Sequence, residues 1–117
     1  MERDMDLVRE ILLEFERTEQ RSVLSHQFEV EGYEDDVVQY HIDLLADAEL
    51  ITQTPAGQFG GKVARLTWDG HEFLDLAKND TRWERAKREV VENVGALVFA
   101  VLKSVLTDLA MSAAGMK

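Results

Sequence analysis

A glycine-rich loop that holds the only proline, near the middle of the chain, constrains the fold more than any other feature. Residues 54–61, TPAGQFGG, hold the only proline and three of the seven glycines, and both residue types favour turns. Residues 62–68, KVARLTW, then alternate as a strand does, while Leu50 and Ile51 lead into a strand before the loop. We therefore predict a β-hairpin with the loop at its tip.

The segments before this hairpin predict two amphipathic helices. Residues 4–16 place apolar side chains at helical spacing, and Asp4 is the expected N-cap. A second helix is predicted to begin at Glu34 or Asp35, where the helix dipole favours carboxylates. Between the two helices, residues 23–31 predict a short strand. The buried stripes are predicted to comprise Leu7, Ile11, Leu12 and Phe15 in the first helix and Val38, Ile42, Leu45 and Ala48 in the second, with His41 beside them.

Three further helices are predicted after the hairpin. The first, over residues 69–79, begins with Thr67 or Asp69 as its cap. Residues 81–84, Thr-Arg-Trp-Glu, match a capping box for the second helix, which Gly95 is expected to end. Phe73, Leu74 and Ala77 are predicted to face inward. Trp68 and Trp83 are predicted to be core or interface residues.

The last predicted helix, over residues 96–113, is apolar on most of its surface. Such a helix packs between other helices or in a subunit interface, so we expect a homodimer formed through it. No second domain is indicated: residues 1–79 are predicted as the core and residues 80–117 as C-terminal helices of the same domain. The predicted interface residues are Leu97, Val98, Val101, Leu102, Val105 and Leu109.

The charge of the chain argues against an ordinary nucleic-acid-binding protein. The 117 residues carry a net charge of −10, and residues 34–49 contain six carboxylates and no lysine or arginine. Phosphate binding depends on lysine and arginine. The longest apolar run has nine residues, far below the ~20 needed to cross a bilayer. With no cysteine and no secretory signal pattern at its start, the protein is expected to be soluble and cytoplasmic.

No enzyme, metal or cofactor signature is found. His26, His41 and His71 are far apart in sequence and lack the spacing of a helical zinc site. The adjacent acids of residues 34–36 are explained more simply as surface residues at a helix start than as a catalytic pair. The sequence therefore predicts a non-enzymatic protein without a catalytic site, metal or cofactor.

Several motifs together resemble one protein family. HIDLLADAELI, residues 41–51, is similar to the end of the third helix of winged-helix proteins. ARLTWDGHEFLD, residues 64–75, is similar to the segment that follows the wing in many of these proteins. With ERDMDLVREILLEFE and NDTRWERAK, the chain resembles the family catalogued as domain of unknown function 2513, whose members are small bacterial and phage or prophage proteins. The resemblance implies an α+β, mainly α, winged-helix fold with a two-stranded wing and a C-terminal helical pair.

Two features of the sequence depart from the winged-helix pattern. The glycine usual before Leu50-Ile51 is Glu49 here, although glycine would take a left-handed helix cap at no steric cost. In addition, residues 23–33 do not resemble the short helix that precedes the recognition helix of a complete winged helix.

The acidic helix leaves more than one function open. One is binding to an unknown protein with a basic surface, by imitating nucleic acid and inhibiting a host nucleic-acid machine such as a CRISPR effector. The alternative is a DNA-binding transcriptional regulator, and the simplest interpretation is a solvated acidic surface. The predicted protein-binding face comprises Glu34, Asp35, Asp36, Gln39, Tyr40, Asp43, Asp47 and Glu49. The nucleic-acid contacts in the alternative would be Lys62, Arg65, Arg82, Arg85, Lys87 and Arg88.

Overall fold

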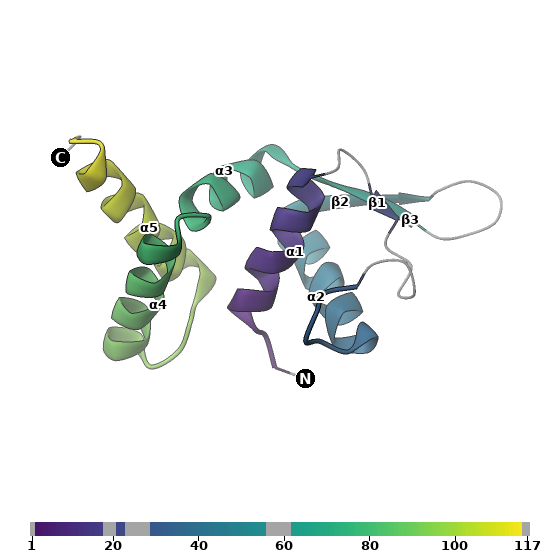
Figure 1. Ribbon diagram of the computed structural model, residues 1–117, viewed down its shortest axis with the longest axis horizontal. Coiled ribbons are helices and arrows are strands. Elements are labelled where there is room, and N and C mark those ends of the chain that lie inside the picture. The colour runs from purple at the N-terminus through teal and green to yellow at the C-terminus, as the bar shows by residue number, and fades with distance from the viewer. Residues whose placement is uncertain (1, 18–20, 23–28, 56–61, 116–117) are drawn as a thin grey trace. The chain divides into compact units, whose positions relative to one another are not determined.

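The computed structural model (Figure 1) describes residues 2–17, 21–22, 29–55 and 62–115. Within these residues the fold is α+β and mainly α, with five helices and one three-stranded antiparallel sheet. The chain forms two compact units, Met1–Glu72 and Phe73–Lys117, which are described separately below. The sequence-based division into a core and C-terminal helices of one domain stays a prediction.

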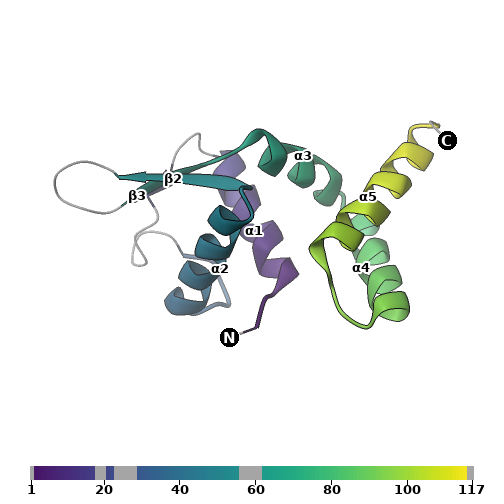
Figure 2. The same cartoon turned by 180° about the vertical axis from the view of Figure 1, so that it is seen from behind.

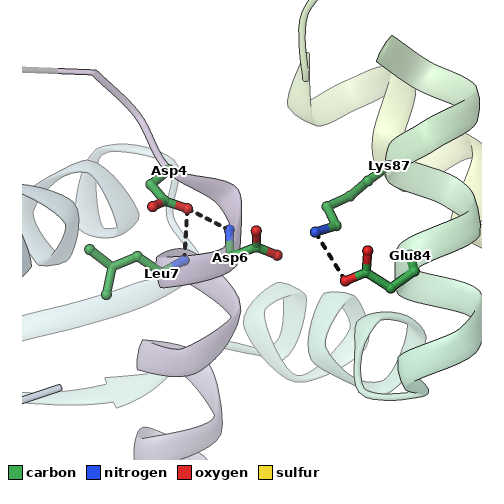
Figure 3. Close-up of polar contacts among 5 residues, drawn as sticks. All are labelled: Asp4, Asp6, Leu7, Glu84 and Lys87. Carbon is green, nitrogen blue, oxygen red and sulfur yellow. Dashed lines mark hydrogen bonds and ion pairs between the residues drawn. The ribbon is translucent and has the colours of Figure 1, made fainter. Parts of the chain in front are cut away.

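The first unit begins with helix α1, whose predicted apolar stripe is confirmed as buried. Asp4 is confirmed as its N-cap: Asp4 Oδ1 accepts hydrogen bonds from the amides of Asp6 at 2.9 Å and Leu7 at 3.2 Å (Figure 3), as expected at a helix start. The elements of this unit are α1 (Met5–Arg17), β1 (Arg21–Ser22), α2 (Asp35–Asp47), β2 (Ile51–Pro55), β3 (Lys62–Leu66) and the first residues of α3 (Trp68–Ala77).

The sheet has the strand order β1-β3-β2. The predicted hairpin is confirmed, with Ile51 opposite Leu66 and Pro55 opposite Lys62; the loop residues 56–61 lie outside the described part. The strand predicted over 23–31 is not found in its described residues, and residues 23–28 lie outside them. The third strand is β1 instead, which no alternating pattern marks because it has only two residues.

Helix α2 ends in a Schellman motif that explains the unusual Glu49. The Leu50 amide donates to the Leu45 carbonyl and the Glu49 amide to the Ala46 carbonyl, both at 3.0 Å, which satisfies the last helical carbonyls. Glu49 has φ 62°, the only positive φ of a non-glycine residue in the described part of the chain. Ala48, predicted to be buried, is exposed, because it is the C-cap at the end of the helix.

The start of α3 is attached directly to the end of α2. The Thr67 hydroxyl donates to the Glu49 carbonyl at 2.7 Å and accepts the Gly70 amide at 3.0 Å, so Thr67 is confirmed as the cap of α3. The Thr67 amide donates to the Leu50 carbonyl at 3.0 Å. A Cβ atom on Gly70 would lie 2.0 Å from the Leu50 carbonyl oxygen. Thr67 and Gly70 therefore both hold the start of α3 against the end of α2.

His41 is packed, as expected, and connects α2 to the start of α1. It is fully buried; Nε2 accepts the Asp4 amide at 2.8 Å, and Nδ1 lies 2.8 Å from the Val37 carbonyl. These partners require the neutral ring with its proton on Nδ1. Tyr33 completes the cluster by donating to Asp4 Oδ2 at 3.2 Å, and burial, followed by the Asp4 charge, raises the pKa of Tyr33.

The second unit contains the end of α3 with helices α4 (Asp80–Val94) and α5 (Phe99–Ala113). Figures 1 and 2 show α4 and α5 side by side. The buried Trp83 ring meets Phe73 edge-on at 6.3 Å, and Phe73 lies 4.8 Å from the Phe99 ring. Trp83 is thus confirmed as a core residue, whereas Trp68, in the first unit, is 78% exposed and is not.

Two helix starts in this unit differ from the sequence-based prediction. Asn79, and not Thr81, caps α4: its side chain accepts the Arg82 amide at 2.9 Å. The helix therefore begins before the predicted capping box. Helix α5 begins at Phe99 after Val98 as N-cap, three residues later than predicted. Gly95 is confirmed as the end of α4, with φ 86°.

Candidate protein-binding surface

The exposed face of α2 carries its carboxylates. Positions 36, 39, 40, 43 and 47 recur at helical spacing and share one side of the helix. The buried residues Val38, Ile42 and Leu45 lie on the other side, where α2 packs against α1 and β2. The same periodicity that buries the apolar stripe thus gathers Asp36, Asp43 and Asp47 on the solvent side.

The structure places five of the eight predicted face residues on this side of α2, namely Asp36, Gln39, Tyr40, Asp43 and Asp47, whereas Glu34, Asp35 and Glu49 lie at the two ends of the helix. Seven are exposed, including Tyr40, and Gln39 is half-buried. Within the described residues no ion pair neutralises an α2 carboxylate. The polar partners of Asp43 are Gln39 and Gln53, whose amides each lie 3.4 Å from Asp43 Oδ1. Among the described residues, the carboxylates of this face therefore have no cationic partner.

An open groove of about 870 Å³ continues this acidic face past the end of α2. It is bounded by the last turn of α2, by β2 and by the start of α3. Four carboxylates and the exposed indole of Trp68 contribute to its wall. The lining residues are Asp43, Ala46, Asp47, Glu49, Ile51, Thr52, Gln53, Thr67, Trp68 and Asp69.

Sequence reasoning missed the part of this groove that follows α2. Gln53, Trp68 and Asp69 were not predicted as site residues. Trp68 was expected to be a core or interface residue, as large aromatic residues often are. Only the helix junction at Thr67 shows that the chain leaves the sheet there and turns the indole to solvent.

The basic residues of the DNA-binding alternative are divided between the two units. Arg65 lies on β3, is exposed and donates to the Leu66 carbonyl at 3.2 Å; Lys62 also lies on β3, and its side chain is outside what the structure describes. On α4, Lys87 pairs with Glu84 at 3.2 Å (Figure 3).

The remaining basic residues of that alternative also lie on α4. Arg85 Nε lies 3.7 Å from Glu89, and Arg82 Nη1 lies 3.5 Å from the Leu76 carbonyl. Arg88 is exposed. Part of the predicted basic cluster is thus already engaged within its own helix.

Neither a metal centre nor a membrane segment emerges from the described residues. They contain no group of three or more histidine or acidic side chains arranged to hold a metal ion. Across the same part of the chain, no helix has the length and apolar character required to cross a membrane.

Comparison with known proteins decides the family. A family model described as "Hypothetical protein (DUF2513)" matches residues 2–96. The chain is 40% identical over 95 residues to an uncharacterized protein of Haemophilus influenzae (strain ATCC 51907 / DSM 11121 / KW20 / Rd), covering 77% of this chain and 79% of the relative. The chain belongs to the DUF2513 family. No solved structure matches it.

The match to the DUF2513 family ends at residue 96, so all six residues of the predicted dimer interface lie beyond it. Of the six interface residues, Leu102 is fully buried and serves the core of its own chain, so it offers no surface to a second copy. Val98 is exposed, and the others are half-buried: Leu97, Val101, Val105 and Leu109. Further exposed apolar side chains in this unit are Val91, Val94 and Met111.

Proposed function

We propose that this DUF2513 protein is a winged-helix binding module that contacts a basic protein surface through the acidic face of α2. The order helix, strand, helix, hairpin and the antiparallel sheet β1-β3-β2 support a winged-helix arrangement. In that arrangement α2 has the position of the recognition helix, which normally enters the major groove of DNA. Because a fold does not assign a function, the chemistry of this helix decides between partners.

The observation that carries the proposal is that the carboxylates on and next to α2 have no ion-pair partner among the described residues. Six carboxylates lie on or next to this helix, without lysine or arginine among residues 34–49. DNA phosphates would repel such a surface, whereas a basic protein groove would attract it and give fast, salt-dependent association. Side chains four residues apart, such as Asp43 and Asp47, are about 6 Å apart along the helix axis. The face can therefore present a row of negative charges as a phosphate backbone does.

The partner we infer is a nucleic-acid-binding protein of the host cell, with a CRISPR effector as one example of such a machine. A protein of phage or prophage origin would act there as an inhibitor by occupying the basic groove. The protein would then be cytoplasmic and would need neither a cofactor nor catalysis.

The proposal is tested by reversing charge on the face. Asp35→Lys/Asp36→Lys/Asp43→Lys protein is used as bait in bacterial lysate beside the wild type, with and without nuclease and at raised salt. We expect the wild type to retain a basic protein after nuclease treatment, to lose it at raised salt, and the variant not to retain it. Circular dichroism verifies that the variant keeps its helices, since acids suit the first turn of α2.

A matched control distinguishes the effect of the α2 face from the effect of the net charge of the protein. Glu31→Lys/Glu72→Lys/Glu92→Lys reverses three exposed acids outside α2. Both variants carry a net charge of −4, because each reversal adds two charges to the −10 of the native chain. Equal loss of the partner in both variants would show that only net charge matters and would contradict the proposal.

DNA binding is the second candidate, favoured by the sheet order and by the exposed Arg65 on the hairpin. It predicts the opposite response, because the same α2 reversal would strengthen binding to duplex DNA. Retention of DNA by the wild type, with loss of all partners after nuclease treatment, would favour this candidate. If the α2 reversal changes neither the capture of a protein partner nor the binding of DNA, the acidic face is a solvated surface.

We also infer that the protein self-associates through the predicted interface residues that are not fully buried, which are Leu97, Val98, Val101, Val105 and Leu109. Light scattering at micromolar concentration is expected to give the mass of a dimer. A monomer mass would refute this inference and leave the acidic face unaffected.

A further inference from the structure

We propose that the groove beside Trp68 receives an arginine side chain of the protein partner. This inference rests on the proposed function, because it names the group by which the basic partner is held at the end of the acidic face. It follows from three features of the groove: an exposed indole on a fixed backbone, several carboxylates around it, and no lysine or arginine among the lining residues that the structure describes.

Trp68 is held outside by the packing of its own helix. Gly70 faces the Leu50 carbonyl at a distance that admits no side chain, and residue 68 lies on nearly the opposite side of the helix. The Thr67 cap holds this first turn against the end of α2. An indole that is 78% exposed on such an anchored turn is a preorganised contact surface, and tryptophan is enriched among residues that dominate interface energies.

The carboxylates around the indole select a cation. Asp69 adjoins Trp68 in sequence, and Asp47 and Glu49 line the groove from the end of α2. Cations bind over the face of an indole, and a carboxylate strengthens the same contact by a charge-assisted hydrogen bond. The combination therefore recognises a positively charged side chain and disfavours an anionic one.

Arginine satisfies this arrangement better than lysine. Its planar guanidinium stacks on an aromatic ring and at the same time donates two parallel hydrogen bonds to a carboxylate, whereas a lysine ammonium is a compact, strongly hydrated charge. Asp43 is also available, because the two glutamine amides near its Oδ1 are at 3.4 Å, longer than the usual hydrogen bond.

Among the described side chains of the neighbouring strand β3, Arg65 does not supply this cation. Arg65 stands opposite Thr52 in the sheet, and Thr52 lines the groove. The guanidinium of Arg65 nevertheless donates to the Leu66 carbonyl, and Arg65 is not among the lining residues. The groove is therefore open to an arginine from another molecule.

The experiment uses a peptide of six arginines and a peptide of six lysines as probes. The chain has two tryptophans, so ¹⁵N-labelled protein gives two indole signals in an NMR titration, and Trp68→Phe identifies that of Trp68. We expect the Trp68 signal to shift to saturation with hexaarginine while that of the buried Trp83 stays in place. Hexaarginine should bind about three- to tenfold more tightly than hexalysine at equal charge, from the contribution of stacking.

Matched variants distinguish the groove from general electrostatics. Trp68→Ala is expected to remove the preference for arginine, with Tyr40→Ala as its control because Tyr40 is an exposed aromatic on the acidic face but not in the groove. Asp69→Asn is expected to weaken hexaarginine more than Asp36→Asn does, although both remove one charge. Trp68→Phe should retain part of the preference.

The outcomes separate this inference from the proposed function. Equal affinity for the two peptides, an unmoved Trp68 signal, or equal losses from Trp68→Ala and Tyr40→Ala would overturn the arginine site. If the lysate partner is still lost on reversal of the α2 face, the proposed function then stands without it. If the α2 reversal leaves the partner bound while Trp68→Ala removes the arginine preference, the groove stands and the proposed face falls.

Discussion

Replacement of Glu49 by glycine should make this protein more stable, although it removes a side chain. Glu49 is the residue of the helix end with a left-handed backbone, φ 62°, in the Schellman motif that ends α2. Its side chain is exposed, and its amide and carbonyl make the hydrogen bonds of the junction. Glycine can make the same backbone contacts without the steric conflict of a Cβ atom.

The magnitude follows from two opposing terms. A left-handed backbone costs a residue with a Cβ atom roughly 1–2 kcal/mol. Glycine avoids this cost, but it loses more conformational entropy on folding, which offsets about 0.5–1 kcal/mol of the gain in stability. The free energy of unfolding should therefore rise by about 1 kcal/mol, which corresponds to an increase in Tm of roughly 3–5 °C for a chain of this size.

Urea denaturation followed by circular dichroism measures this change, with two controls. Glu49→Gln removes the charge at the carboxyl end of α2, where a negative charge is unfavourable, but keeps the Cβ atom. Ala48→Gly introduces glycine at the preceding residue, whose φ of −82° is right-handed, and should destabilise. A gain from Glu49→Gln as large as that from Glu49→Gly would refute the backbone argument and assign the effect to charge.

Three further substitutions test contacts that define the fold. Gly70→Ala should lower the free energy of unfolding by about 3 kcal/mol or more, because its Cβ atom would lie 2.0 Å from the Leu50 carbonyl oxygen; chemical denaturation measures the loss. His41→Leu should cost roughly 1–3 kcal/mol in the same assay, because the Asp4 amide loses its acceptor. Asn79→Ala should cost about 1 kcal/mol and reduce thermal stability, because it removes the side-chain cap of α4.

Asn79→Ala and His41→Leu each have a matched control. Thr81→Ala should change stability by less than about 0.5 kcal/mol, and a larger loss than that of Asn79→Ala would favour the capping box at residues 81–84. His71 is exposed, so His71→Leu should leave the unfolding curve nearly unchanged. A stable Gly70→Ala protein would show that the junction of α2 and α3 can move apart.

Much of the candidate surface was predictable because it depends on local periodicity. The buried stripe of α2 and its acidic opposite face follow from helical spacing alone, and the structure places both as expected apart from Ala48. The groove was not predictable, because its walls come from segments separated in sequence, such as Asp43 and Trp68. Their proximity depends on hydrogen bonds between residues far apart along the chain, above all that from Thr67 to Glu49.

The sequence by itself determined the helices with strong apolar stripes, the hairpin, the cap at Asp4, the end of α4 at Gly95, and the concentration of acid on α2. Each of these is encoded by neighbouring residues, so the pattern is sufficient. Only the tertiary structure decided that β1 joins the sheet, that Glu49 adopts a left-handed backbone, and that Trp68 faces solvent. The pairing of β1 and the exposure of Trp68 depend on packing between residues far apart in the chain, which overrides local preference. At Glu49 the hydrogen bonds that end α2 impose a backbone conformation that a residue with a Cβ atom disfavours.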